Sequence, residues 1–192
     1  GDKVAISHNW SSNFTTTQYG VEVSDGGSSA RFQGDFTLDD GTNTFIVVSP
    51  FVAAKSQSKN YNRVFLEWPS AQTPVLASDG QASSPDPRAQ VLLAREDYST
   101  KEAVPSSINL SFAHFSAYLR MRFTNVNLST SSGDATVISV SMETEDTPLT
   151  GRFQYYFGAE SDYEHFENND GGFKIVTAAV NSFTDGEDIW VG

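Results

Sequence analysis

The sequence predicts an all-β fold, and three observations carry this prediction. Residues 107–124 contain two stretches in which every second residue is apolar, namely Ile108, Leu110 and Phe112, and then Leu119, Met121 and Phe123. A period of two places alternate side chains on opposite faces of a strand. Similar short segments recur along the chain with turn residues between them, and no window of a dozen residues keeps a helical period. We therefore expect a half-solvated antiparallel β-sandwich.

The first third of the chain contains a run that is typical of a buried strand. Residues 45–51 are mostly β-branched or aromatic, with Pro50 near the end of the run. The sequence Asp-Asp-Gly-Thr at 39–42 predicts the turn before it. Further strands are predicted at 4–7, 20–23, 32–38 and 63–68.

Residues 69–88 carry four prolines, at 69, 74, 85 and 87, together with many Ser and Ala. This composition predicts an irregular excursion over the surface. Residues 97–103 are compatible with a helical turn. Strands are predicted again at 90–95, in both halves of 107–124, and at 136–144, 149–157, 173–180 and 189–191.

The composition limits the classes of partner and chemistry. The formal charge of -12 argues against binding to nucleic acid or to an anionic membrane surface. The 192-residue chain has no cysteine, which excludes disulfides, thiolate zinc sites and cysteine nucleophiles. The chain begins Gly1-Asp2-Lys3, as a processed fragment would, and we expect any export signal or lipid anchor to lie outside it.

No catalytic, cofactor-binding or metal site is predicted. The nucleophile elbow, the P-loop and the dinucleotide-binding glycine motif are missing from the sequence. His8, His114 and His165 lie far apart, and we interpret His114 as a packed, hydrogen-bonded residue of a strand or its edge.

The acidic segment 158–172 offers oxygen ligands of the type that calcium takes, including Asp162, Glu164, Glu167 and Asp170. Its spacing is not that of an EF-hand, and a solvated acidic loop explains the residues equally well. We expect that the loop does not require calcium.

Aromatic residues leave one binding function open. Trp10, Trp68 and Trp190, with Tyr155, Tyr156 and Tyr163, are candidates for stacking on sugars. The alternative is that they fill the core, as large aromatic side chains most often do.

The order of several short motifs resembles the fimbrillin-like proteins of Bacteroidales, which are major and minor fimbrial subunits and related surface lipoproteins. The similarity covers about the first 155 residues. The segments that carry it are G-D-K-V at 1–4, F-Q-G-D-F at 32–36, V-S-P at 48–50, L-E-W-P-S-A-Q at 66–72, L-L-A at 92–94, L-S-F-A-H-F-S-A-Y-L at 110–119, I-S-V-S-M at 138–142 and L-T-G at 149–151. Trp68-Pro69 departs from the usual Leu-Pro of the family.

The resemblance implies a transthyretin-like antiparallel β-sandwich at 1–146, followed by the opening part of a second β domain at 147–192. It also implies a cell-surface location at the outer membrane or fimbrium. The expected function is that of a non-enzymatic structural or adhesive subunit that joins other fimbrial subunits by strand exchange at a sheet edge. Surface proteins or glycans of the host or of other bacteria are further expected partners.

Two alternatives remain open. A glycan-binding surface lipoprotein would show at least two exposed coplanar aromatic rings around a concave site. A secreted β-sandwich hydrolase would need facing acids about 5–10 Å apart in a cleft. If the apolar face of 107–123 is core, Phe112→Ala should cost about 3–5 kcal/mol of stability.

Overall fold

The structure is a computed structural model, and it describes the greater part of the chain. The described residues are 3–9, 15–18, 37–55, 63–78, 82–101, 106–124, 129–130, 133–134, 137–157, 165–168, 172–179 and 188–191. These residues form strands and two single-turn 3-10 helices, η1 (Phe51–Ala53) and η2 (Pro87–Ala89). The predicted all-β class is therefore confirmed. Predicted strand 20–23 and residues 32–36 lie outside the described residues.

The described chain divides into two compact units, and each is assembled from three segments. Unit 1 comprises 1–66, 91–115 and 154–167, and unit 2 comprises 67–90, 116–153 and 168–192. The cuts between them fall within three strands, β5 (Arg63–Trp68), β15 (Gly151–Tyr156) and β16 (His165–Asn168). The expected domains, 1–146 and 147–192, are continuous along the chain, and that division stays a prediction.

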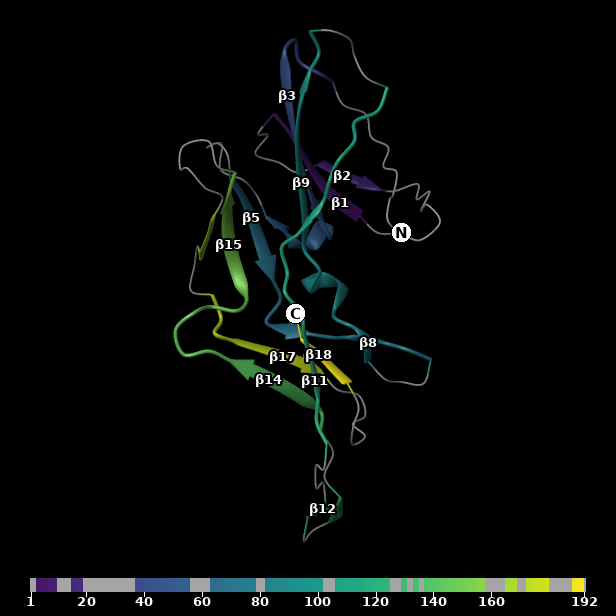
Figure 1. The fold of residues 1–192 in the computed structure, drawn as a ribbon, viewed down its shortest axis with the longest axis vertical. Helices are drawn as coiled ribbons and strands as arrows, with labels where there is room; N and C mark the ends of the chain where they lie inside the picture. Colours follow the sequence, from purple (N-terminus) through teal and green to yellow (C-terminus); the bar gives the residue numbers. More distant parts are fainter. Residues whose placement is uncertain are drawn as a thin grey trace. The chain divides into compact units, whose positions relative to one another are not determined.

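Unit 1 is built around a five-stranded antiparallel sheet in the order β10-β9-β3-β1-β2 (Figure 1). The strands are β1 (Lys3–His8), β2 (Thr15–Gln18), β3 (Thr42–Ser49), β9 (Leu92–Ser99) and β10 (Ala113–His114). Strand β3 pairs with β9 over its whole length, from Thr42 opposite Ser99 to Ser49 opposite Leu92. Residues 97–99 belong to β9, so the helical turn expected at 97–103 is wrong there.

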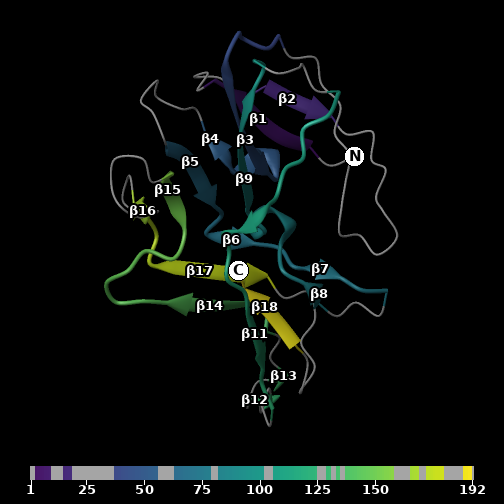
Figure 2. The same ribbon diagram turned by 45° about the horizontal axis from the view of Figure 1, so that its top comes forward.

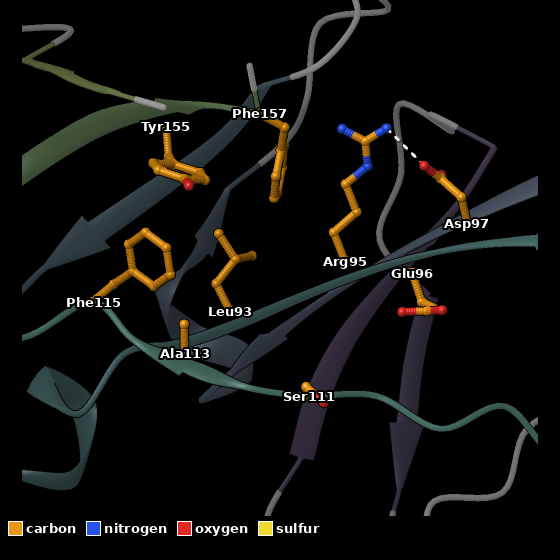
Figure 3. A pocket seen from close by; sticks show the side chains of 9 residues that line it. All are labelled: Leu93, Arg95, Glu96, Asp97, Ser111, Ala113, Phe115, Tyr155 and Phe157. Carbon is orange, nitrogen blue, oxygen red and sulfur yellow. Dashed lines mark hydrogen bonds and ion pairs between the residues drawn. The ribbon is translucent and has the colours of Figure 1, made fainter. Parts of the chain in front are cut away.

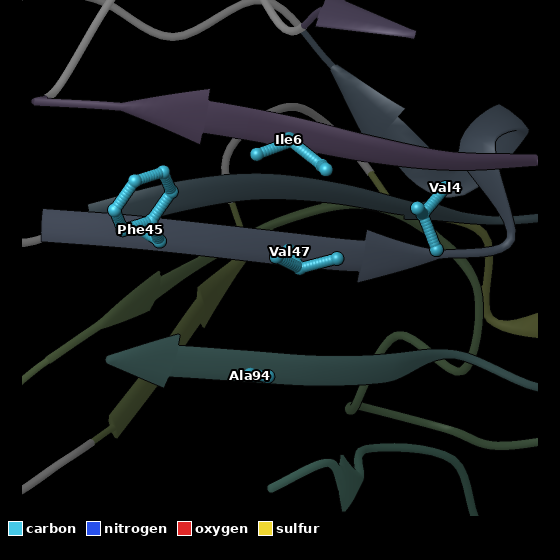
Figure 4. Packing of buried hydrophobic residues seen from close by; sticks show 5 residues of the cluster. All are labelled: Val4, Ile6, Phe45, Val47 and Ala94. Carbon is cyan, nitrogen blue, oxygen red and sulfur yellow. The ribbon is translucent and has the colours of Figure 1, made fainter. Parts of the chain in front are cut away.

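One face of this sheet carries the first apolar core (Figure 4). Its buried residues are Val4 and Ile6 of β1, Phe45 and Val47 of β3, and Ala94 of β9. The neighbouring side chains Ile46 and Val48 point to the opposite face and are also buried. Burial on both faces explains why β3 reads as a continuous apolar run rather than an alternating one.

Unit 2 contains a mixed sheet and a two-stranded ribbon. The sheet has the order β14-β17-β6, with β14 (Ser139–Glu143) antiparallel and β6 (Ala71–Gln72) parallel to β17 (Ile175–Ala179), as Figure 2 shows. The ribbon pairs β11 (Leu119–Arg122) with β18 (Asp188–Val191).

The remaining strands are short. They are β4 (Ala54–Lys55), β7 (Val75–Leu76), β8 (Ala82–Ser84), β12 (Ser129–Thr130), β13 (Gly133–Asp134) and β16 (His165–Asn168). Strands β7 and β8 form a hairpin, as do β12 and β13, and β16 and β4 flank β15 and β5 in the order β16-β15-β5-β4.

A second apolar core lies within unit 2. Val176 and Ala178 of β17 and Ile189 and Val191 of β18 are buried there. The partly buried side chains packed against them are Met121, Val140, Met142 and Leu149. Each unit therefore buries an apolar cluster of its own.

The proline-rich segment 69–88 is more ordered than its composition predicts. It contains β6, β7, β8 and η2, and Pro74 and Pro85 are buried. The carboxylate of Asp86 is the anchor, because it accepts hydrogen bonds from the backbone N–H of Thr73 at 2.7 Å and of Arg88 at 2.8 Å, and pairs with Arg88 Nη2 at 2.5 Å. Burial raises the pKa of Asp86, but the hydrogen bonds from Arg88 and Thr73 outweigh burial and leave that pKa below its ordinary value.

Gly151 begins β15 at a point where a side chain cannot be placed. Its φ is +105°, and a Cβ there would lie 2.9 Å from Cα of Gly172. The adjacent bridge between Thr150 and Phe173 brings these two backbones together. These two constraints explain why the L-T-G motif ends in glycine in this chain.

Candidate functional site

The described part of unit 1 has a hollow of about 490 Å³ beside the β9–β10 edge of its sheet (Figure 3). Strand β9 supplies the floor, the chain on either side of β10 supplies one rim, and the end of β15 supplies aromatic side chains. The lining residues are Leu93, Arg95, Glu96, Asp97, Ser111, Ala113, Phe115, Tyr155 and Phe157.

The aromatic wall of the hollow packs as a core does. The rings of Phe115 and Tyr155 lie 4.6 Å apart at 73°, and those of Tyr155 and Phe157 lie 5.0 Å apart at 83°. These are edge-to-face contacts. Tyr155 and Phe157 are only 4% and 6% exposed. The wall is therefore packed core and does not present coplanar exposed rings on which a sugar stacks.

Two of the three charged side chains that line the hollow, Arg95 and Asp97, form an ion pair. Arg95 Nη2 lies 3.0 Å from Asp97 Oδ2, and the Thr44 hydroxyl donates to Asp97 Oδ1 at 2.6 Å. The Arg95 guanidinium also lies over the Phe157 ring, 5.3 Å from its centre. Glu96 and Asp97 are consecutive on a strand, so their side chains point to opposite faces. These two acids, the only ones that line the hollow, are not placed as a facing catalytic pair.

Beside the hollow, the ladder between β9 and β10 is short. It consists of Leu93 opposite Ala113 and Leu92 opposite His114, and the N–H of Phe115 donates to the Val91 carbonyl at 2.9 Å. Residues 107–112 immediately precede β10 in the sequence and are irregular. The predicted strand at 107–112 is therefore wrong as a hydrogen-bonded element.

The alternation of side chains in 107–112 is nevertheless present. Ile108, Leu110 and Phe112 are half-buried against the first core, and Asn109 and Ser111 between them are exposed. The predicted apolar face is thus confirmed for this half of 107–124. The second half departs from the prediction because Leu119 and Phe123 are 42% and 38% exposed, and Met121 alone packs against the second core.

The register fixes which backbone groups of β9 face the hollow side. Because Thr100 N–H donates to the Gly41 carbonyl, residues 41 and 100 form a hydrogen-bonded pair, and such pairs alternate along the β3–β9 ladder. Asp97, opposite Thr44, is therefore in a non-hydrogen-bonded pair with β3. Its N–H and carbonyl point to the outer edge of β9.

A second polar cluster lies on the β11–β18 ribbon in unit 2. Asp188 forms ion pairs with Arg120 Nη2 and, at 2.9 Å, with Arg122 Nε. The Arg120 guanidinium lies 5.5 Å from the centre of the Trp190 ring. Hydrogen bonds from Arg120 and then from Arg122 lower the pKa of Asp188 from 3.8 to about 2. The cluster places one half-buried tryptophan among charged groups.

The three histidines have different places. His8 Nε2 lies 2.8 Å from Asn43 Oδ1, and its ring stacks on Phe45 at 4.8 Å. His114 is on the edge strand β10, as expected, but it is exposed rather than packed. His165 begins β16, and its side chain lies outside the described residues.

The aromatic residues that were candidates for stacking on sugars also differ in their burial. Trp68 is buried, donates to the Ser116 hydroxyl at 3.0 Å and meets Phe153 edge-on, so it fills the core. Tyr155 is buried, and its neighbour Tyr156 is half-buried. Trp10 and Tyr163 lie outside the described residues.

The expected behaviour of the acidic loop stays a prediction. Of 158–172, the structure describes the backbone of 165–168 and residue 172, so its acidic side chains lie outside the described residues. Among the residues that are described, no three His, Asp or Glu side chains group as a metal site.

Comparison of the chain with protein-family models, with curated proteins and with solved structures finds no match. Within the described residues, no helix has the length and apolar character needed to cross a membrane. The functional argument therefore depends on the site itself and on the motif resemblance.

Proposed function

We propose that the protein is a structural or adhesive subunit of cell-surface fimbriae, which joins neighbouring subunits by β-strand pairing at the outer edge of β9. The observation that carries the proposal is the short β9–β10 ladder beside the hollow. The motif resemblance supports the fimbrial assignment and the location at the outer membrane. The proposal assigns no catalysis and no cofactor.

An added strand would be held by two kinds of contact. Outward-facing N–H and carbonyl groups of β9, such as those of Asp97, would bond to its backbone. Alternate side chains of the strand would project over the hollow, whose lining combines the apolar Leu93, Phe115 and Tyr155 with the charged residues of β9. Backbone bonds supply affinity in this mode of recognition, and the side-chain hollow supplies specificity.

The charge of the chain bears on the conditions of assembly. Copies of a chain with a formal charge of -12 repel one another at low ionic strength. Association between subunits should therefore increase with salt. The same charge disfavours nucleic acid as a partner.

The decisive experiment blocks the edge of β9 with proline. Asp97→Pro removes an outward N–H and leaves the β3 ladder bonds in place, because residue 97 does not donate to β3. Asp97→Ala is the matched control, since it loses the same contacts with Arg95 and Thr44. Self-association is measured by light scattering and electron microscopy across a salt series. We expect Asp97→Ala to associate and Asp97→Pro to lose association by at least tenfold. Equal association of the two variants would contradict the use of this edge.

A glycan-binding surface lipoprotein is the second candidate function. The cluster of Arg120, Arg122, Asp188 and Trp190 favours it, because aromatic and charged polar groups lie together on one ribbon. Binding to a glycan array by the wild type, with loss in Trp190→Ala, would support this function. Retention of all binding in that variant would remove the cluster from consideration.

A further inference from the structure

We propose that residues 107–112 are a strand arm that closes onto β9 and shuts the edge used for assembly. This inference rests on the proposed function and concerns its regulation. In the structure, the arm and β9 are joined at the β10 end and are not paired in a ladder beyond Ala113. Figure 3 shows Ser111 across the hollow from Arg95 and Asp97.

The register of a closed arm follows from the existing ladder. Leu92 pairs with His114 and Leu93 with Ala113, so the continuation places Phe112 opposite Ala94, Leu110 opposite Glu96 and Ile108 opposite Tyr98. Ala94 is part of the first core, and Glu96 shares its sheet face with Phe45, which lies opposite it on β3. The apolar residues of the arm thus fall on the core face in this register.

The structure already holds those side chains on that face. Ile108, Leu110 and Phe112 pack against the first core while their backbone is irregular. Closing the arm therefore keeps these side chains on the core face and adds backbone hydrogen bonds to β9. The alternating sequence of 107–112, which predicts a strand, is consistent with the closed form.

The opposite face of the arm agrees with this register. Ser111 and Asn109 would lie opposite Arg95 and Asp97, on the side of the sheet that carries the hollow. Both arm residues are polar and exposed, so no apolar side chain would be forced onto the charged rim. The edge thus has a form closed by its own chain and a form open to a strand from another molecule.

A disulfide pair tests the closed form directly. The chain has no cysteine, so an engineered pair is the only thiol pair present. In the closed register Glu96 and Leu110 form a non-hydrogen-bonded pair, whose Cα atoms lie about 4.5 Å apart, within the range of a disulfide. Glu96→Cys with Leu110→Cys is the test pair. Glu96→Cys with Asn109→Cys is the matched control, because residue 109 faces the other side.

Mild oxidation is followed by mass spectrometry and by hydrogen exchange of 107–112. We expect the test pair to close at least tenfold faster than the control pair, and the oxidised protein to exchange its arm amides at least tenfold more slowly. Oxidation should also lower self-association at least tenfold, and reduction should restore it. Closure of the test pair no faster than the control would overturn the arm proposal.

The outcomes separate this inference from the proposed function. If the test pair closes but the oxidised protein associates as well as the reduced protein, the arm does not shut the edge and the inference is wrong. If neither the wild type nor Asn109→Pro, whose arm cannot pair with β9 at residue 109, associates at any salt concentration, the proposed function is wrong. The rates of disulfide closure then decide alone whether the arm closes in this register.

Discussion

Asn43 is fully buried in β3, and its side-chain amide is used in both directions. Its Oδ1 accepts from the backbone N–H of Asp39 at 2.8 Å and contacts His8 Nε2 at the same distance. Its Nδ2 donates to the Asp39 carbonyl at 2.9 Å. A buried amide is tolerated when its bonds are satisfied. Asn43 therefore holds the turn at 39–42 against the start of the sheet.

The ion pairs of Asp188 predict that the stability of the folded protein falls in acid. Because Arg120 and Arg122 bond to its ionised form, its pKa falls from 3.8 to about 2. A carboxyl group with a lowered pKa contributes stability above its ordinary pKa, and this contribution is lost as the pH falls toward the folded value. We expect the stability advantage of the wild type over Asp188→Asn to be present at pH 5 and to decline between about pH 4 and pH 2.

NMR titration of the Asp188 carboxyl carbon checks this response. Arg122→Ala should return its midpoint toward 3.8, because one of the two bonding partners is removed. A wild-type midpoint at the ordinary value would contradict the bridging geometry.

At the scale of elements, β3 and the arm 107–112 show that two predicted strands can differ in pairing and in depth of burial. Phe45 lies in a ladder between two strands and is 4% exposed. Phe112 packs on the same core but is half-buried in irregular chain. The depth of burial, rather than the alternation itself, sets the contribution of each ring to stability.

Phe45→Ala should destabilise the protein by about 3–5 kcal/mol, as expected for a buried ring. Phe112→Ala should cost about 2 kcal/mol, less than its sequence pattern alone predicts, because part of the ring already contacts solvent. Urea unfolding measures both, with Asn109→Ala as an exposed control that should change stability by less than about 0.5 kcal/mol. Equal losses for the two phenylalanines would show that the arm is as firmly packed as β3.

The comparison with sequence-based expectation can be made element by element. The run at 45–51 predicted most of β3, because burial on both faces of a strand leaves a continuous apolar run, and the strand predicted at 63–68 is β5. The prediction of a buried face was wrong for Leu119 and Phe123, because a period of two predicts that side chains share a face but not that another element covers it. The regular elements within 69–88 were not predicted, because they depend on the hydrogen bonds of Asp86 and on pairing with β17. Neither leaves a pattern in the local sequence.

The candidate site was less predictable than the fold. No motif marks the hollow, whose walls come from three separate stretches of chain. The alternating residues Ile108, Leu110 and Phe112 predicted a paired strand beside it, but they pack against the first core and do not line the hollow. Ladder formation depends on the neighbouring backbone, which side-chain patterns do not describe.

At the scale of the whole molecule, the two units are interleaved along the chain. All four buried residues of the second core, Val176, Ala178, Ile189 and Val191, come from the last stretch of sequence. Their partly buried neighbours Met121, Val140 and Met142 come from before residue 146. A cut at the predicted domain boundary would therefore separate the two sides of this core.

A fragment of residues 1–146 should consequently fail to fold cooperatively. It would lack β15, β17 and β18 and would expose apolar residues of both units. The expected results are binding of a hydrophobic dye, weak near-ultraviolet circular dichroism and a broad urea transition. The full chain is the control. A sharp two-state transition in the fragment would instead support a self-sufficient domain at 1–146.

The parallel pairing of β6 with β17 places Ala71 opposite Thr177 and Gln72 opposite Ala178. On the ribosome, the first of these strands emerges long before the second. Its partner side stays empty until β17 has been synthesised, so the mixed sheet cannot form before that stage of translation.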